Sequence, residues 1–140
     1  MRCRHWLECA ISAFALLALA SPLVPSANAE MMDIYVTGEM LAQDCRNFMF
    51  TRRAGGQGSL EQHAGAQRCY AYVTGVFDLT AEFVATGRTE PTYCIPRGTN
   101  AIVLAEIVAT YSDKNPAHRN RSGADLVSQA WSAAFPCPSR

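Results

Sequence analysis

Of the six cysteines in this chain, the four widely separated ones beyond residue 29 restrict its possible folds more than any other feature. No two of them form the C-x-x-C motif of thioredoxin chemistry or haem attachment, and none stands in a cluster of zinc ligands. An even number of such cysteines in a small exported protein is typical of two structural disulfides, for which three pairings are possible. We therefore expect a cross-linked fold that contains no metal and no cofactor. The four residues are Cys45, Cys69, Cys94 and Cys137.

The N-terminal segment predicts export. Basic residues precede an apolar run over residues 10–20, and Ala27-Asn28-Ala29 is a small-x-small cleavage site. The run is too short to span a bilayer, which requires about 20 apolar residues. We predict a signal peptide over residues 1–29 and one domain over residues 30–140. This domain is expected in the periplasm, with no membrane attachment after cleavage.

Charge and titratable groups give little support for catalysis or nucleic-acid binding. The chain contains 12 basic and 12 acidic residues, without the positive excess that nucleic acids and anionic membranes attract. Neither His63 nor His118 has a distinctive neighbour that would make it a general base. Asp78 and Glu82, four residues apart, fit a solvated helix edge better than a catalytic carboxylate pair. We interpret the protein as a binding protein rather than an enzyme.

Helical periodicity dominates the chain after the leader. Thr37 can cap one helix, and Ser59 can form a capping box with Gln62 at the start of the next. With no strand signal of any length, we predict an all-α domain of four helices arranged as two antiparallel hairpins. The predicted helices run from Gly38 to about Phe50, from near Leu60 to Gly87, from a cap at Thr99 or Asn100 to near Ser112, and from Pro116 to the residue before Pro136.

The second predicted helix carries the widest apolar stripe, which indicates a central core helix. Gly75 lies within this stripe, where glycine costs about 1 kcal/mol relative to alanine, so we expect a neighbouring backbone to pack closely on it. Asp78 lies beside the stripe, in a position to accept buried hydrogen bonds. We expect Gly65 to fray or kink the first turns of this helix.

The hairpin arrangement selects one of the three disulfide pairings. Cys45 and Cys69 are equally far along the chain from the first turn, so they stand at the same height in an antiparallel pair. Cys94 and Cys137 are nearly equally far from Pro116 in the second hairpin. We therefore predict the pairs Cys45–Cys69 and Cys94–Cys137.

A charged turn between the third and fourth predicted helices is the best candidate for a binding site. Asp113, Lys114 and Asn115 would stand on a scaffold that has already lost the conformational freedom that binding otherwise costs. A second candidate surface, on the proline-containing connector before the third helix, is formed by Arg88, Glu90 and Arg97.

Three blocks of sequence, in a fixed order, carry a resemblance to a known family. They are C-Y-A-Y-V-T-G-V-F-D over residues 69–78, Y-C-I-P-R-G over residues 93–98 followed by N-P at residues 115–116, and L-V-x-x-A-W-x-A-A-F-P-C over residues 126–137. These blocks resemble the Rap/Tai family. Its members are periplasmic immunity proteins that neutralise peptidoglycan amidase effectors delivered by type VI secretion.

This resemblance implies a small helical fold with disulfides, commonly dimeric, whose protruding turn blocks the amidase active site. The turn would map to residues 113–115. Two positions depart from the family's usual pattern: Val103 replaces a glutamine, and Trp131 replaces a leucine. An exposed Trp131 would be a dimer or partner contact, and a buried one would be core. Besides the four cysteines, the scaffold positions that the resemblance carries over are Tyr72, Gly75, Asp78, Pro96, Gly98, Pro116, Phe135 and Pro136.

We therefore expect a non-enzymatic periplasmic immunity protein that binds and occludes a cognate peptidoglycan amidase, in which a homodimer is a possible form. The alternative is a periplasmic stress chaperone, or a small binding protein without an amidase partner, because small disulfide-linked helical domains also serve these roles. A chaperone would need apolar surface that becomes exposed under stress, for example at low pH.

Overall fold

The computed structural model describes residues 35–138, so the signal peptide predicted over residues 1–29 lies outside the described residues. Over this range the all-α fold and its four α-helices are confirmed, with one isolated β-bridge between Thr37 and Ser122 as the only strand-like pairing in the described part. The elements are α2 (Gly38–Arg53), α3 (Leu60–Ala85), α4 (Ala101–Lys114), the 3-10 helix η1 (Pro116–Asn120) and α5 (Gly123–Ala134).

Each α-helix begins at a residue whose side-chain oxygen accepts a hydrogen bond from the first turn, which satisfies a backbone donor that the helix itself leaves free. These caps are Thr37, Ser59, Asn100 and Ser122. The predicted capping box is confirmed, because Ser59 Oγ accepts from the Gln62 amide while Gln62 Oε1 accepts from the Ser59 amide. The predicted end of α3 is also confirmed: Gly87 follows the C-cap with φ 69°, a conformation that favours glycine.

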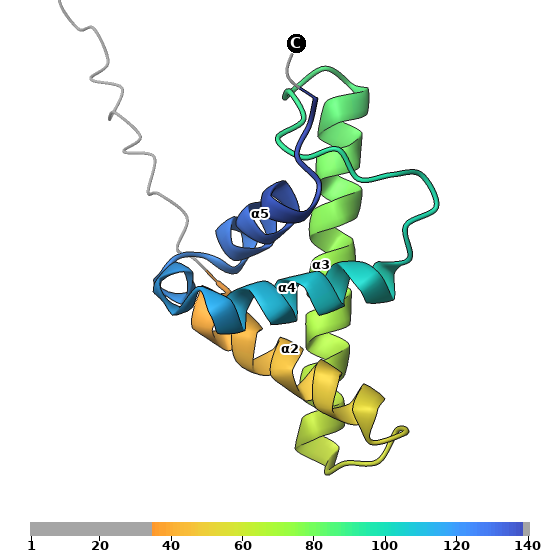
Figure 1. Ribbon diagram of the computed structural model, residues 1–140, viewed down its shortest axis with the longest axis vertical. Helices are drawn as coiled ribbons and strands as arrows, with labels where there is room; N and C mark the ends of the chain where they lie inside the picture. The colour runs from red at the N-terminus through yellow and green to blue at the C-terminus, as the bar shows by residue number, and fades with distance from the viewer. Residues whose placement is uncertain (1–34, 139–140) are drawn as a thin grey trace, which may run out of the picture. The chain divides into compact units, whose positions relative to one another are not determined.

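The core lies where α2, α4 and α5 meet the middle of α3 (Figure 1). Figure 1 shows α3 as the longest helix, with α2 crossing it and α4 lying between α2 and α5. Buried alanines on α2, α4 and α5 let these helices approach closely around a few large side chains; they are Ala42, Ala105, Ala109 and Ala130. The largest fully buried hydrophobic side chains are Trp131, Leu41, Leu104, Leu126, Val73, Val108 and Val127.

The prediction that α3 is a core helix along its whole stripe is only partly correct. Its buried residues end at Val73, and the following turns are half-buried or exposed. Gly75 is exposed, and a Cβ added there would meet nothing within 4 Å, so the expected backbone contact at Gly75 is wrong. Close packing occurs instead at buried Gly65, where a Cβ would lie 3.1 Å from Asn47 Cβ. The helix runs through Gly65 without interruption, because α2 covers this side of it.

The connection between α4 and α5 differs from the predicted tight turn. The helix continues to Lys114, so Asp113 and Lys114 belong to its last turn. Pro116 takes the first position of η1 rather than of the fourth α-helix, and α5 begins only at Gly123. The chain is extended at Arg121, which breaks the helical path before Ser122 caps α5. Helix α2 likewise ends at Arg53, three residues beyond the predicted Phe50.

Both predicted disulfides are confirmed, with Cα–Cα distances of 5.0 Å for Cys45–Cys69 and 4.9 Å for Cys94–Cys137. The first is fully buried between α2 and α3. The second lies at the surface and joins the connector before α4 to the segment after α5. A hydrogen bond from the Cys94 amide to the Phe135 carbonyl, 2.8 Å long, runs beside it.

Candidate partner-binding face

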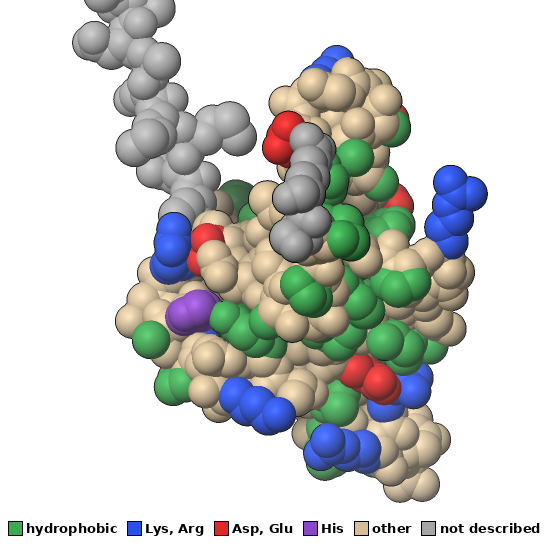
Figure 2. Space-filling view, turned by 45° about the horizontal axis from the view of Figure 1, so that its top comes forward, with side chains coloured by type: hydrophobic (Ala, Val, Ile, Leu, Met, Phe, Trp, Pro, Cys, Tyr) green, Lys and Arg blue, Asp and Glu red, His purple; other side chains and the backbone are tan. Residues whose placement is uncertain are grey.

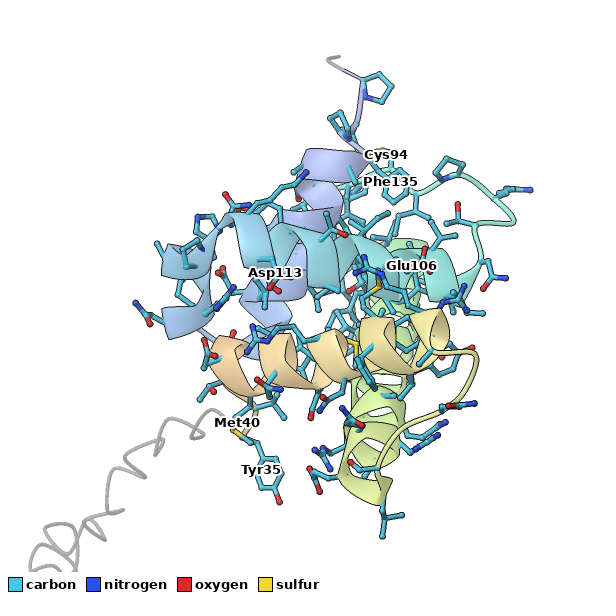
Figure 3. The ribbon with its side chains drawn as sticks, turned by 60° about the horizontal axis from the view of Figure 1, so that its bottom comes forward. Tyr35, Met40, Cys94, Glu106, Asp113 and Phe135 are labelled. Atoms are coloured by element: carbon cyan, nitrogen blue, oxygen red, sulfur yellow. A yellow bond between two sulfur atoms is a disulfide. The ribbon has the colours of Figure 1, made fainter. Side chains whose placement is uncertain are left out.

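The side of α4 that points away from the core carries exposed residues at helical spacing, with half-buried Glu106 and Ile107 among them. Val103 is 42% exposed, and Thr110 and Lys114 are also exposed. Figure 3 shows Glu106 and Asp113 on α4, with α2 alongside. We call this surface the α4 face, and it consists of Val103, Glu106, Ile107, Thr110, Asp113 and Lys114.

A groove of about 410 Å³ follows the α4 face on its α2 side. Its lining combines apolar and charged side chains, and Phe50 among them is 48% exposed. We call it the α2–α4 groove, and it is lined by Arg46, Met49, Phe50, Arg53, Ala54, Ala109, Thr110 and Asp113.

A second groove, of about 340 Å³, follows the α4 face on its α5 side. Alanines 130, 133 and 134 of α5 form its far wall, so the wall is low and apolar. Both grooves are lined by Thr110, which places the exposed ridge of α4 between them. In Figure 2 hydrophobic side chains gather over the middle of the face that is in view, with Lys and Arg side chains at its edges. An apolar centre with a polar rim is the usual anatomy of a protein-binding surface.

The three predicted binding residues lie at one end of the α4 face, but they do not form an exposed loop. Asp113 lines the α2–α4 groove, whereas Lys114 lines the groove on the α5 side. The side-chain amide of half-buried Asn115 donates to the Tyr111 carbonyl at 2.9 Å and so ends α4. Of the three, Lys114 is the residue whose charge points to solvent without an ion pair inside the described range.

Asp113 takes part in a network of four charged side chains that joins α2, α4 and η1. Its Oδ1 lies 3.3 Å from Arg119 and 3.6 Å from Arg46, and both arginines also reach Glu39. Arg119 Nε also donates to the Ser112 carbonyl at 2.9 Å, which satisfies a free acceptor at the end of α4. The network therefore fixes the position of the last turn of α4, although each exposed pair alone contributes at most about 1 kcal/mol.

The titratable residues considered for catalysis occupy structural or solvated positions. The Tyr111 hydroxyl lies 2.9 Å from His118 Nδ1, and the His63 ring lies between two backbone carbonyls. Asp78 and Glu82 are exposed on α3, so the expected buried hydrogen bonds of Asp78 are wrong. Residues 35–138 contain no group of three or more His, Cys, Asp or Glu side chains that could hold a metal ion. Within the same range no helix is both long and apolar enough to cross a membrane.

Several of the predicted scaffold positions have an observable structural role. The Tyr72 hydroxyl would lie 3.0 Å from a Cβ at Gly123, so the ring of Tyr72 packs closely on the start of α5 and would have to shift to make room for a larger residue there. Burial of its phenol raises the pKa of Tyr72. The Pro96 carbonyl accepts from both the amide and the hydroxyl of Thr99 across a turn in which Gly98 has φ 82°. Pro116 takes the first position of η1, and the Phe135 carbonyl accepts from the Cys94 amide. Gly75, Asp78 and Pro136 are exposed.

Trp131 is a core residue and not a surface contact. It is fully buried, and its indole N–H donates to the Leu104 carbonyl at 3.3 Å. The rings of Phe77 and Tyr93 pack edge-on against it, with centroids 6.2 and 5.2 Å away. The larger side chain therefore fills the space where α3, α4, α5 and the connector meet.

The α2 wall of the groove was not anticipated from the sequence. Arg46, Met49, Phe50 and Arg53 recur at helical spacing on one side of α2. This spacing is visible in the sequence, but it does not reveal which helix packs beside it. The helix predicted from the sequence ends at about Phe50, so Arg53 belongs to the predicted loop and not to the helix.

Comparison with known proteins identifies the family. A family model described as Rap1a immunity proteins matches residues 37–137, from the cap of α2 to the last cysteine. No curated protein matches the chain. The matched segment includes all five helices described above and both disulfides. It covers well over half of the chain, and the chain therefore belongs to the Rap1a immunity protein family.

Proposed function

We propose that this protein is exported to the periplasm and there binds a peptidoglycan amidase delivered by type VI secretion, whose active site it occludes. Membership of an immunity family implies a secreted effector protein as the partner and a role that is generally non-enzymatic. The amidase target follows from the sequence resemblance. The two disulfides fit a protein that works outside the reducing cytoplasm.

The α4 face is the observation that carries this proposal. It is an exposed helical ridge between two grooves, on a core that two disulfides cross-link. A rigid surface loses little conformational entropy on binding, so more of the contact energy appears as affinity. We propose that the C-terminal end of this ridge enters the substrate cleft of the amidase.

The three residues predicted for binding have different parts in this proposal. Asp113 and Asn115 hold the end of α4 through the ionic network and the bond to Tyr111. Lys114 offers an exposed charge and would make direct contact with the effector. A homodimer is part of the proposal as well, because the resemblance implies one, and analytical ultracentrifugation of the oxidised protein tests it.

The test begins with capture of partners by the oxidised protein, residues 30–140, from a lysate that contains the secreted toxins of its own organism. Mass spectrometry of the captured material should find an amidase in stoichiometric amount, and calorimetry with the purified amidase should give a nanomolar Kd. Recovery of many envelope proteins in sub-stoichiometric amounts, with no amidase, would contradict the proposal and favour the chaperone. The mass of the protein recovered from the periplasm tests cleavage after Ala29.

A further inference from the structure

We propose that the α2–α4 groove receives a loop of the effector that carries a carboxylate, and that Arg53 is the residue that pairs with it. This proposal rests on the proposed function and names the chemistry by which the effector is recognised. It concerns residues of α2 that stand outside the predicted turn at residues 113–115.

The groove has the form of a site for one or two side chains. Its volume of about 410 Å³ lies within the usual range of small-ligand sites, roughly 300 to 1,000 Å³. Met49, Phe50, Ala54 and Ala109 supply apolar surface, and Phe50 stays 48% exposed beside it. An apolar side chain of a partner loop would therefore find an apolar surface here that is still in contact with water.

The charges along this groove are not balanced. Its lining contains two arginines and one carboxylate. Arg46 lies 3.6 Å from Asp113, and the nearby Glu106 is 2.9 Å from Arg52. Arg53 is exposed and makes no ion pair with any residue in the range 35–138. The carboxylates beside the groove are thus already paired, and one guanidinium remains available.

A carboxylate is the group that matches this guanidinium best. Arginine presents a planar fork of donors that binds both oxygens of a carboxylate, with roughly twice the strength of a neutral hydrogen bond. Arg53 lies two helical turns beyond Arg46 on the same side of α2. An acidic residue next to an apolar one in the partner loop could therefore reach Arg53 while its neighbour contacts Phe50.

A second copy of this chain is a poorer occupant of the groove. Two copies facing each other through it would bring the same excess of positive charge together, and like charges at an interface oppose association. A partner with a negative loop gains from the same charges. We therefore assign the groove to the effector and not to a dimer contact.

The test compares Arg53→Glu with Arg121→Glu, two variants with the same change in net charge. Arg121 is an exposed arginine between η1 and α5 that belongs to neither candidate surface and does not line the α2–α4 groove. By calorimetry with the amidase, Arg53→Glu should weaken binding by more than about tenfold, while Arg121→Glu should leave the Kd within about twofold. Arg53→Lys should lie between wild type and Arg53→Glu. Equal affinities of the two glutamate variants would overturn the proposal.

A small probe separates this proposal from the proposed function. The probe is 3-phenylpropionate, which joins an apolar ring to a carboxylate, and its neutral amide is the matched control. In NMR spectra of wild type, the acid at millimolar concentration should shift signals of Phe50 and Arg53. In Arg53→Glu the acid should leave the Phe50 signals unshifted, and the amide should shift these signals in neither protein. If wild type binds no amidase, the proposed function fails, and the probe alone decides: selective shifts support the groove chemistry, and their absence rejects it.

Discussion

His63 illustrates how one exposed side chain can stabilise a loop. Its Nδ1 lies 2.9 Å from the Ser59 carbonyl and its Nε2 lies 2.9 Å from the Gly56 carbonyl. A carbonyl oxygen only accepts, so both contacts become hydrogen bonds when both ring nitrogens carry protons. These contacts, first with Ser59 and then with Gly56, raise the pKa of His63 above 6.5. The folded protein therefore binds this proton more tightly than the unfolded chain.

A pH dependence of stability follows from the raised pKa of His63. Its contribution should be fully present below the unfolded pKa of about 6.5 and should be lost as the pH rises through the folded pKa. We expect His63→Ala to lower the free energy of unfolding more at about pH 5.5 than at about pH 9. Urea titrations of both proteins at the two pH values measure this difference. An equal loss at both pH values would contradict the two hydrogen bonds of the protonated His63 ring.

Two glycines should respond in opposite ways to alanine. At Gly75 a Cβ meets nothing within 4 Å, so Gly75→Ala should raise the free energy of unfolding by about 1 kcal/mol through helix propensity. At Gly38 a Cβ would lie 2.8 Å from the backbone oxygen of Arg119, so Gly38→Ala should lower it by roughly 1 to 3 kcal/mol. Chemical denaturation of both variants is the measurement. Destabilisation by Gly75→Ala would show that the exposed side of α3 has a contact not described above.

The same glycines show a limit of inference from sequence. Helical periodicity placed Gly75 on an apolar stripe, but periodicity cannot say what covers each part of a stripe. In the structure α2 packs on the first half of α3 and makes Gly65 the close contact. That outcome depends on the position at which two helices cross, which no local pattern encodes.

At the scale of elements, the helix starts could be predicted because their cause is local. A cap such as Ser59 lies within four residues of the amide that it satisfies. The last turn of α4, beyond the predicted end near Ser112, could not be predicted, because Arg119 returns from η1 to the Ser112 carbonyl and stabilises this turn together with the Asn115 cap. The disulfide pairing followed from the equal heights of cysteines in antiparallel helices, and this simple geometry holds in the fold.

The two disulfides should differ in their response to reductant. Cys45 and Cys69 are fully buried, whereas Cys94 is exposed and Cys137 is half-buried. Because a thiolate must reach a sulfur atom to attack it, mild thiol treatment of the folded protein should open Cys94–Cys137 first. Alkylation and peptide mapping after partial reduction give the order. Reduction of both bonds at the same rate in the native state would contradict it.

Loss of the exposed disulfide should also weaken the fold. The bond closes a segment with a sequence separation of 43, and the chain-entropy model assigns about 4 kcal/mol to a loop of this size. We expect the Cys94→Ala, Cys137→Ala double variant to lose roughly this much free energy of unfolding while it keeps its helical circular dichroism. An unchanged midpoint in urea would show that the connector is held by its packing on Trp131 alone.

For the molecule as a whole, the proposed binding site could be predicted less well than the fold. The charged residues at the end of α4 could be found, because they interrupt an apolar pattern between two helices. The grooves beside α4 could not, since they exist only where α2 and α5 pack against it. Phe50 and Arg53 line a groove because of that packing and not because of their neighbours in the chain.

The central claim, that this protein blocks an amidase, is tested most directly by a titration of enzyme activity. Hydrolysis of purified peptidoglycan by the captured amidase is followed while oxidised protein is added. Lys114→Glu changes the end of the α4 face, and Asp78→Asn, which changes an exposed residue of α3, is the control. We predict complete inhibition at equimolar wild type and at equimolar control, and a requirement for a large excess of Lys114→Glu. Full amidase activity in the presence of saturating, correctly folded wild-type protein would contradict the account.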